Sequence, residues 1–244
     1  MSTQSTTPPE ATVLPIIAAI AFCHMLNDLM QSLIPAIYPV LKGQLGLSFG
    51  QIGLVTFVFQ GTASILQPIV GLITDRRPLP YSLPFGMGLT LIGLVMLAHA
   101  ATFAMVLVSV AFVGMGSSVF HPESSRIARL AAGRRPGFAQ SFFQVGGNAG
   151  SSLGPLLAAF IVVPFGQISV EWFAGVALVG IGVLWAISRW YASEGQTRLR
   201  AAKVRAAGTV FGRRIVAFAI MVLIALSFSK FVFLVHIAAI IRSI

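Results

Sequence analysis

The chain has 244 residues, of which 57% are hydrophobic and only 9% are charged, and its mean hydropathy is +0.91. Ordinary soluble domains carry about 25% charged residues, so this composition excludes a soluble globular protein and indicates an integral membrane protein. The net charge of +10 would suggest a nucleic-acid-binding protein if the chain were soluble. The single cysteine, Cys23, excludes a disulfide framework.

Seven apolar stretches are long enough to cross a bilayer, whose hydrocarbon core of about 30 Å needs about 20 residues of helix. The runs are continuous, which is typical of helices and not of the alternating strands of a membrane β-barrel. We expect membrane helices over 14–41, 51–73, 81–100, 103–123, 139–163, 168–190 and 215–241.

The N-terminal tail and the basic residues predict the orientation of these helices. Residues 1–13 contain no Lys or Arg and do not resemble a cleaved signal peptide. Two Lys or Arg residues follow the second helix, four follow the fourth, and seven lie at the end of the sixth or after it, counting Arg189, whereas the loops after the first, third and fifth hold only Lys42. Because loops rich in Lys and Arg stay in the cytoplasm, we expect a cytoplasmic N-terminus. The same rule explains the positive net charge, which therefore no longer indicates a nucleic-acid-binding protein.

The first predicted helix carries polar side chains in the middle of an apolar run. His24, Asp28 and Gln31 fall within about 60° of one another on a helical wheel, with Asn27 at the edge of this face. An ionised aspartate at the centre of a membrane helix costs about 2.5–3.5 kcal/mol, so this face must contact protein or water. Two interpretations stay open: a structural cluster in which Asp28 is hydrogen-bonded, or a titratable pair that lines a translocation path.

The second predicted helix combines a polar face with a charged end. Gln60, Ser64 and Gln67 share the face. The helix ends in the sequence GLITDRR, where Gly71 and Asp75 are four residues apart and therefore lie beside each other, and Arg76 and Arg77 follow.

The fourth predicted helix ends in SVFHPESSRIARL. Pro122 removes an intrahelical hydrogen bond and frees a backbone carbonyl next to His121 and Glu123. One interpretation is a helix end at the membrane interface, where Glu123 and Arg126 form an ion pair three residues apart. The other is an acid at the cytoplasmic mouth of a cavity, paired with Arg126 and able to exchange protons.

The fifth predicted helix contains a polar face and several glycines. The polar face comprises Gln140, Gln144, Asn148, Ser151 and Pro155. The glycines are Gly146, Gly147, Gly150 and Gly154. Small residues permit the close approach of another helix, so this segment is interpreted equally as tight packing, as cavity lining, or as both.

The polar stretch 191–214 separates a six-helix bundle from one further helix. We therefore expect a cytoplasmic tail over 1–13, a bundle over 14–190, a basic cytoplasmic linker over 191–214 and a seventh helix over 215–244.

Several of these segments resemble the major facilitator superfamily. The motif G-x-x-x-D-R-R at Gly71–Arg77 and the motif G-x-x-x-G-P at Gly150–Pro155 each lie in the helix where that superfamily carries them. The strings HMLNDLMQSLIPAIYPVL, SVFHPESSRIARLAAG and QSFFQVGGNAGSSLGPLLAA closely resemble the fosmidomycin resistance protein subfamily of proton-coupled drug exporters of the bacterial inner membrane. The resemblance covers residues 14–234, with departures at Pro78-Leu79-Pro80 and at Ala158 and Ala159.

The resemblance implies an all-α integral membrane fold, in which a six-helix bundle of two inverted three-helix repeats is followed by a seventh helix. The family has two such halves, and the tail VHIAAIIRSI does not resemble the family's continuation, so we expect a chain truncated or frameshifted within the seventh helix.

By the same resemblance, the protein exports a small-molecule drug such as fosmidomycin in exchange for protons, by alternating access. The expected partners are the substrate, protons, the lipid bilayer and either a missing C-terminal half or a second copy. No cofactor, metal or nucleic acid is expected. The alternative is a fragment that inserts into the membrane but does not transport alone. An intramembrane enzyme is disfavoured, because the sequence has no nucleophile-and-base pair and no metal-spaced histidines.

The implied site residues fall into groups. For proton coupling they are His24, Asp28, His121 and Glu123. For contact with the substrate they are Asn27, Gln31, Gln60, Gln67, Gln144 and Asn148. The gating motif comprises Gly71, Asp75, Arg76 and Arg77, the antiporter motif comprises Gly150, Gly154 and Pro155, and Arg126 is the salt-bridge candidate.

Overall fold

The computed structural model describes residues 11–207, 212, 214–226 and 229. All regular secondary structure within these residues is helical, and no strand occurs among them. The prediction of an all-α fold is therefore confirmed. The chain divides into two compact units, Met1–Arg198 and Leu199–Ile244, and all the side chains predicted to form a site belong to the first.

The helices of the first unit cover the six stretches predicted there as membrane helices. In chain order they are α1 (Leu14–Ala36), α2 (Tyr38–Leu45), α3 (Phe49–Arg76), α4 (Ser82–Ala98), α5 (Phe103–Ala131), α6 (Pro136–Leu157), the π-helical η1 (Ala158–Val162), α7 (Val163–Phe165), the 3₁₀-helical η2 (Gln167–Trp172), α8 (Phe173–Trp190) and the π-helical η3 (Tyr191–Gly195). Helix α9 (Gln196–Ala207) begins in the first unit, and a helix over Arg214–Leu226 lies in the second. The rest of the seventh predicted helix, beyond residue 229, lies outside the described residues.

The first predicted helix is divided in two at Ile37. Pro39 lies in the first turn of α2, directly after the break. Its ring clashes with the carbonyl four residues before it and it has no N–H to donate, which favours a break between the two helices here. Helix α2 then ends at Gly46, whose backbone is left-handed with a φ of 63°. Glycine adopts this conformation without steric cost.

Helix α5 continues past the end of the apolar stretch that predicted it. It passes through Pro122 and ends only at Ala131. Ile127, Ala128 and Ala131 are fully buried in this last part, so tertiary packing stabilises helix where hydropathy alone predicted a loop.

The start of the polar segment after residue 190 is also helical. Arg198 is only 8% exposed. Its guanidinium donates to the backbone carbonyls of Ala11 and Leu130, at 2.9 and 3.3 Å, and to a carboxylate oxygen of Glu194 at 2.8 Å. These contacts attach the segment to the residues that precede α1 and to the end of α5.

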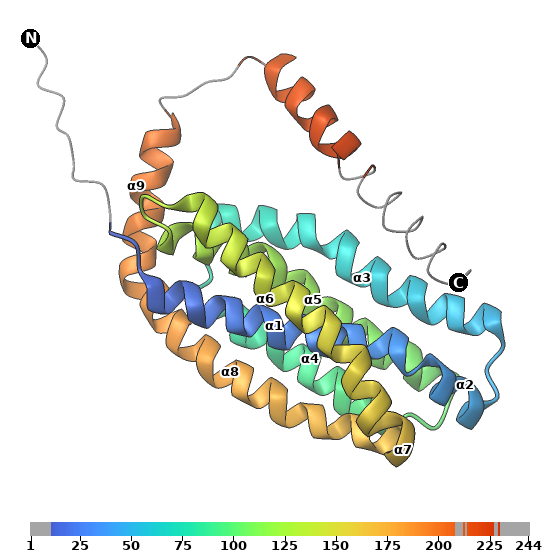
Figure 1. The fold of residues 1–244 in the computed structure, drawn as a ribbon. Helices are drawn as coiled ribbons and strands as arrows, with labels where there is room; N and C mark the ends of the chain where they lie inside the picture. The colour runs from blue at the N-terminus through green and yellow to red at the C-terminus, as the bar shows by residue number, and fades with distance from the viewer. Residues whose placement is uncertain (1–10, 208–211, 213, 227–228, 230–244) are drawn as a thin grey trace, which may run out of the picture. The chain divides into compact units, whose positions relative to one another are not determined.

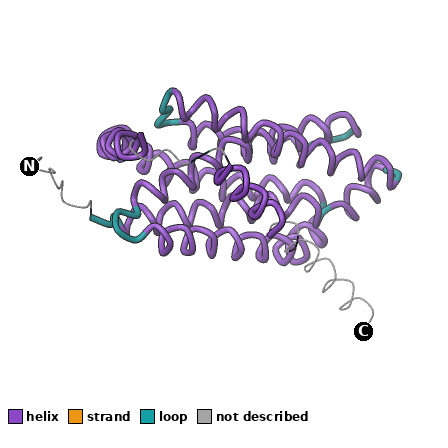
Figure 2. Tube along the Cα trace, turned by 90° about the horizontal axis from the view of Figure 1, so that it is seen from above, coloured by secondary structure: helices purple, strands orange, loops and turns teal. Residues whose placement is uncertain are grey.

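The long helices of the first unit pack lengthwise beside one another (Figures 1 and 2). Helix α1 contacts α5, α6 and α8, helix α4 contacts α5 and α8, and helix α3 contacts α5. Fully buried apolar side chains fill the space between them, among them Met30, Leu33, Leu94 and Val113. Helices α1 and α5 thus lie at the centre of the unit, where the polar residues of both are found.

Five helical stretches among the described residues are long and apolar enough to cross a membrane. They are Leu14–Ala36, Phe49–Arg76, Phe103–Ala131, Pro136–Phe165 and Gln167–Ala202. Helix α4 is apolar but has 17 residues, which at about 1.5 Å per residue gives about 25 Å. Large hydrophobic side chains on α3, such as Phe57 and Ile65, are 70% and 67% exposed, and a bilayer supplies the apolar surroundings that they require.

Helices α1 and α6 approach each other closely because α6 presents glycines to α1. A Cβ atom added to Gly150 would lie 2.1 Å from the Met25 carbonyl oxygen, and one added to Gly154 would lie 2.0 Å from Ser32 Oγ. The Ser32 hydroxyl donates to the carbonyls of Leu29, at 3.1 Å, and of Gly150, at 3.4 Å. The contact therefore requires residues without a side chain at these positions.

Replacing Gly150 by alanine is expected to force the two helices apart. Overpacking of this kind costs about 1–3 kcal/mol, and the loss is measured as a lower Tm of the purified protein in detergent. The matched control is Gly182→Ala on α8, where an added Cβ meets no atom within 4 Å and higher helix propensity favours alanine by up to about 1 kcal/mol. Equal Tm values for the two variants would contradict the packing described.

Candidate functional site

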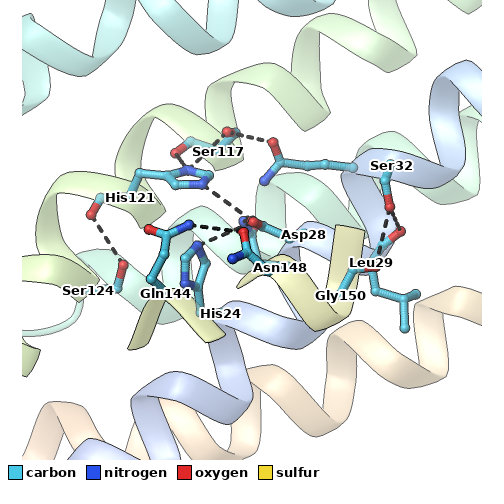
Figure 3. A network of polar contacts seen from close by, with 12 residues as sticks. His24, Asp28, Leu29, Ser32, Ser117, His121, Ser124, Gln144, Asn148 and Gly150 are labelled. Carbon is cyan, nitrogen blue, oxygen red and sulfur yellow. Dashed lines mark hydrogen bonds and ion pairs between the residues drawn. The ribbon is translucent and has the colours of Figure 1, made fainter. Parts of the chain in front are cut away.

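The carboxylate of Asp28 lies between two imidazoles that come from different helices. Its Oδ2 is 3.3 Å from Nε2 of His24, one turn earlier on α1, and its Oδ1 is 3.3 Å from Nε2 of His121 on α5. Figure 3 shows both rings directed at the carboxylate. The three side chains, which we call the triad, are buried or half-buried between the helices.

His24 is held by Phe143 in two ways, through ring stacking and through a hydrogen bond at Nδ1. The ring is 2% exposed and stacks on Phe143 of α6, with centroids 3.9 Å apart and planes 13° from parallel. Its Nδ1 lies 2.8 Å from the backbone carbonyl oxygen of Phe143. A carbonyl oxygen can only accept, so Nδ1 carries a proton and donates it.

His121 is fixed in the same way by its own helix. Its Nδ1 lies 3.1 Å from the Ser117 carbonyl oxygen and 3.3 Å from Ser117 Oγ. The Ser117 hydroxyl donates to Gln31 Oε1 at 2.9 Å, so its oxygen is free to accept from Nδ1. Both histidines therefore keep Nδ1 protonated and present Nε2 to Asp28.

Gly147 on α6 makes room for this arrangement. A Cβ atom at this position would lie 2.4 Å from Cε1 of His24 and 2.8 Å from Oδ2 of Asp28. Any side chain here would therefore push His24 or Asp28 out of position, which gives this glycine a role in the site that the sequence did not single out.

Amides surround the triad, and some of their atoms have no partner. Asn27, which is fully buried, donates from Nδ2 to Asp28 Oδ1 at 3.1 Å. Asn27 Oδ1 and Gln31 Nε2 are buried and make no hydrogen bond within the described part of the chain. Buried polar atoms of this kind normally pair with water or a ligand, so polar contacts remain to be made beside Asp28.

The other predicted substrate-contact residues lie on α6 and α3. Gln144 donates to Asn148 at 3.3 Å on the exposed side of α6, and Figure 3 places both beside the triad. Gln60 and Gln67 lie on α3, where Gln60 is exposed and Gln67 is half-buried.

Glu123 belongs to a second cluster, at the ends of α3 and α5. Its carboxylate is fully buried and accepts from Arg126 at 2.7 Å. Arg126 also pairs with Asp75, near the end of α3, while Arg76 and Arg77 beside it are exposed. A polar pocket of about 650 Å³ lies next to this cluster and is lined by Pro122, Ser125, Arg126, Arg129, Pro136, Gly137 and Gln140.

The four residues predicted for proton coupling are thus divided between two clusters. The periodicity of α1 places His24 beside Asp28, as predicted. The sequence grouped His121 with Glu123, whereas its side chain contacts Asp28. No sequence signal reports which face of α5 meets α1, and this register decides where His121 points.

The triad also has the composition of a metal site. The ligand atoms of His24, Asp28 and His121 all lie within 4.8 Å of one another. The sequence offered no such cluster, because His121 lies far along the chain from the other two.

Comparison with known proteins identifies relatives along most of the chain. A family profile described as Major Facilitator Superfamily matches residues 20–242. The fosmidomycin resistance protein of Escherichia coli is 51% identical over 238 residues, which are 96% of this chain and 58% of that protein. YfnC of Bacillus subtilis, an uncharacterised transporter of the major facilitator superfamily type, is 46% identical over 186 residues, which are 76% of this chain and 46% of that protein.

Solved structures with this fold include two of the peptide transporter POT. The complex with sulfate has a TM-score of 0.63 and 21% identity, covering 91% of this chain and 48% of that one. The complex with alafosfalin has a TM-score of 0.62 and 22% identity, covering 86% and 46%. The chain therefore spans about half the length of the proteins it matches, and these relatives are transporters and not enzymes.

Replacing Arg126 by glutamine is expected to leave Glu123 buried beside no cation. Removing one partner of a buried ion pair costs about 3–5 kcal/mol, whereas the double variant Glu123→Gln/Arg126→Gln recovers much of that loss. Unfolding in detergent with increasing denaturant measures the difference. Arg129→Gln, which changes an exposed arginine nearby, is the control and shifts stability by less than about 0.5 kcal/mol. A double variant no more stable than Arg126→Gln would contradict the pairing.

Proposed function

Because this chain belongs to the major facilitator superfamily, we propose that it forms the N-terminal part of a proton-coupled exporter that moves a small molecule across the bacterial inner membrane. The observation that carries the proposal is the position of Asp28, an acid inside a helical bundle that contacts two histidines. Ionisable groups within membrane helices usually mark substrate or proton routes.

The hydrogen-bond pattern of the triad supports a role in proton transfer. Each Nδ1 donates to a backbone carbonyl, so a neutral imidazole has only a lone pair at Nε2. Two such lone pairs facing an ionised Asp28 would repel it, and a proton placed in either gap turns one repulsion into a hydrogen bond. The triad therefore has states that differ by one proton. A proton between His24 and Asp28 makes a contact within α1, whereas a proton between His121 and Asp28 makes a contact between α1 and α5.

Because the contact between α1 and α5 depends on this proton, the protonation state of the triad would be linked to the conformation of the bundle. Alternating access in this family is described as the rocking of helix bundles around a site near the middle of the membrane. A proton between His121 and Asp28 would tie α5 to α1, and its loss would release this tie. Asp75, Arg126 and Glu123 would form a second tie at one end of α3 and α5, which we propose as the cytoplasmic gate.

The distribution of charge supports the proposed orientation. Arg198 contacts Ala11, which precedes α1, and Leu130, near the end of α5. Arg76 and Arg77 lie at the end of α3, and Arg134 and Arg135 lie between α5 and α6. Figure 1 shows the end of α3 and the start of α6 on the same side as the start of α1. Lys42 lies in α2, on the other side. Under the positive-inside rule the first side, with the N-terminus, is cytoplasmic.

The substrate proposed is a drug such as fosmidomycin, because the E. coli relative is named for resistance to it. Asn27, Gln31, Gln144 and Asn148 supply neutral donors and acceptors beside the triad and are the proposed substrate contacts. The bilayer and a C-terminal half, or a second copy of the chain, complete the proposed assembly. A chain that inserts without transporting alone is the alternative.

The proposal is tested in cells that lack their own exporter of this type. Two proteins are compared: the 244-residue chain, and a chimera in which this chain replaces the matching part of the E. coli relative. Increased fosmidomycin tolerance with the chimera supports the proposal. Tolerance with the chain as well shows that it suffices, whereas tolerance with the chimera alone supports the alternative for the isolated chain. Failure of an abundant, membrane-inserted chimera would overturn the proposal.

The proton-coupling role predicts that Asp28→Asn abolishes exchange. In acidified inverted vesicles, drug added to the chimera is expected to release protons, and the asparagine variant is expected to match vesicles without the protein. The control is His99→Gln, which removes a histidine that directly follows α4 and pairs with Glu171 at 2.9 Å, a pair that shares no residue with the triad. Undiminished proton release by Asp28→Asn, at equal abundance, would exclude this residue from coupling.

A further inference from the structure

We propose that His24, Asp28 and His121 also form a binding site for a divalent transition-metal ion of the zinc class. The inference stands on the donor atoms of the triad and on the groups that orient them. It uses the same side chains as the proposed proton coupling, but its test does not depend on transport.

The donor set and its spacing suit zinc. Imidazole nitrogens and a carboxylate oxygen are three of the ligand types that zinc prefers, at about 2.0–2.2 Å from the ion. In a tetrahedron of that size neighbouring ligand atoms are about 3.3–3.5 Å apart. His24 Nε2 lies 3.3 Å from Asp28 Oδ2 and His121 Nε2 lies 3.3 Å from Asp28 Oδ1, so each imidazole approaches a different oxygen of the carboxylate. One ligand atom from each of the three residues lies within 4.8 Å of the other two.

The surroundings orient the ligands for this use. A metal-ligating histidine almost always donates its other ring N–H to a carbonyl or carboxylate, which fixes the tautomer. Both histidines do so here, to the Phe143 and Ser117 carbonyl oxygens, and thus direct Nε2 lone pairs towards Asp28. Asp28 Oδ1 is itself hydrogen-bonded by Asn27.

The site also leaves one coordination position open, and its carboxylate favours a bound cation. Three protein ligands leave a fourth position of tetrahedral zinc for water. Two buried polar atoms without a partner in the described part of the chain lie close to the triad. One is Oδ1 of Asn27, a residue that donates a hydrogen bond to Asp28. The other is Nε2 of Gln31, a residue that is linked to His121 through the Ser117 hydroxyl. A divalent ion would also neutralise the Asp28 carboxylate away from bulk water.

The test measures zinc bound to the purified 244-residue chain in nanodiscs by equilibrium dialysis. The parent protein carries His99→Ala and His236→Ala, so that His24 and His121 are the only histidines left. About one zinc ion per chain is expected, since the triad is one three-ligand site. Co²⁺ in place of zinc is expected to give the visible absorption of a four-coordinate site.

Ligand removal and ligand replacement distinguish the site from general binding. Loss of an outer-shell partner weakens metal binding about 10–100-fold, so loss of a ligand in His121→Ala or Asp28→Asn is expected to weaken it by more than about 100-fold. His121→Cys supplies another zinc ligand and is expected to retain the ion. Zinc is also expected to raise the Tm of the parent and of His121→Cys, but not of His121→Ala.

Absence of zinc from the folded parent would overturn the inference, as would equal binding by a variant lacking all three ligands. Neither result bears on export, because the assay measures the metal and not the drug. Conversely, a failed transport assay leaves the metal measurement intact.

Discussion

The central constraint on this structure is an acid side chain placed among membrane helices. Asp28 can be accommodated there only if neighbouring groups donate hydrogen bonds or supply positive charge to it. Two histidines and Asn27 surround it, and each depends on a particular helix arrangement. Helix α5 must present His121 to α1, and α6 must approach closely enough for the Phe143 carbonyl to hold His24. The glycines of α6 permit that approach, so the α1–α6 contact and the site are one structural feature.

Each of the two ionisable clusters compensates a carboxylate that lies inside the bundle, but the compensating groups differ. Glu123 is paired with Arg126, a permanent cation, and this cation also contacts Asp75. Asp28 has only histidines, whose charge depends on whether they hold a second proton. The ion pair of Glu123 with Arg126 is suited to a contact that depends on geometry alone. The contact of Asp28 with the two histidines is suited to one that responds to the proton concentration.

The sequence predicted the helical membrane fold and part of the site, because both depend on local periodicity. Helical spacing placed His24, Asp28 and Gln31 on one face, and the small residues of α6 indicated tight packing, cavity lining or both. The contact of His121 with Asp28 could not be predicted, because it depends on how α5 is rotated against α1. The extension of α5 to Ala131 and the helical conformation after residue 190 were missed for a related reason: hydropathy reports the length of an apolar run, whereas Ile127 and Arg198 are ordered by tertiary contacts.

The two Nδ1 atoms of the triad rest on main-chain carbonyls, and this has a consequence for how the site tolerates sequence change. Every residue type supplies a carbonyl oxygen, so substitutions at positions 143 and 117 leave both acceptors in place as long as α5 and α6 keep their course. The choice of tautomer is therefore a property of the fold and not of any neighbouring side chain. Substitutions among the other side chains beside the triad can therefore accumulate while the two imidazoles continue to face Asp28 with the same nitrogen.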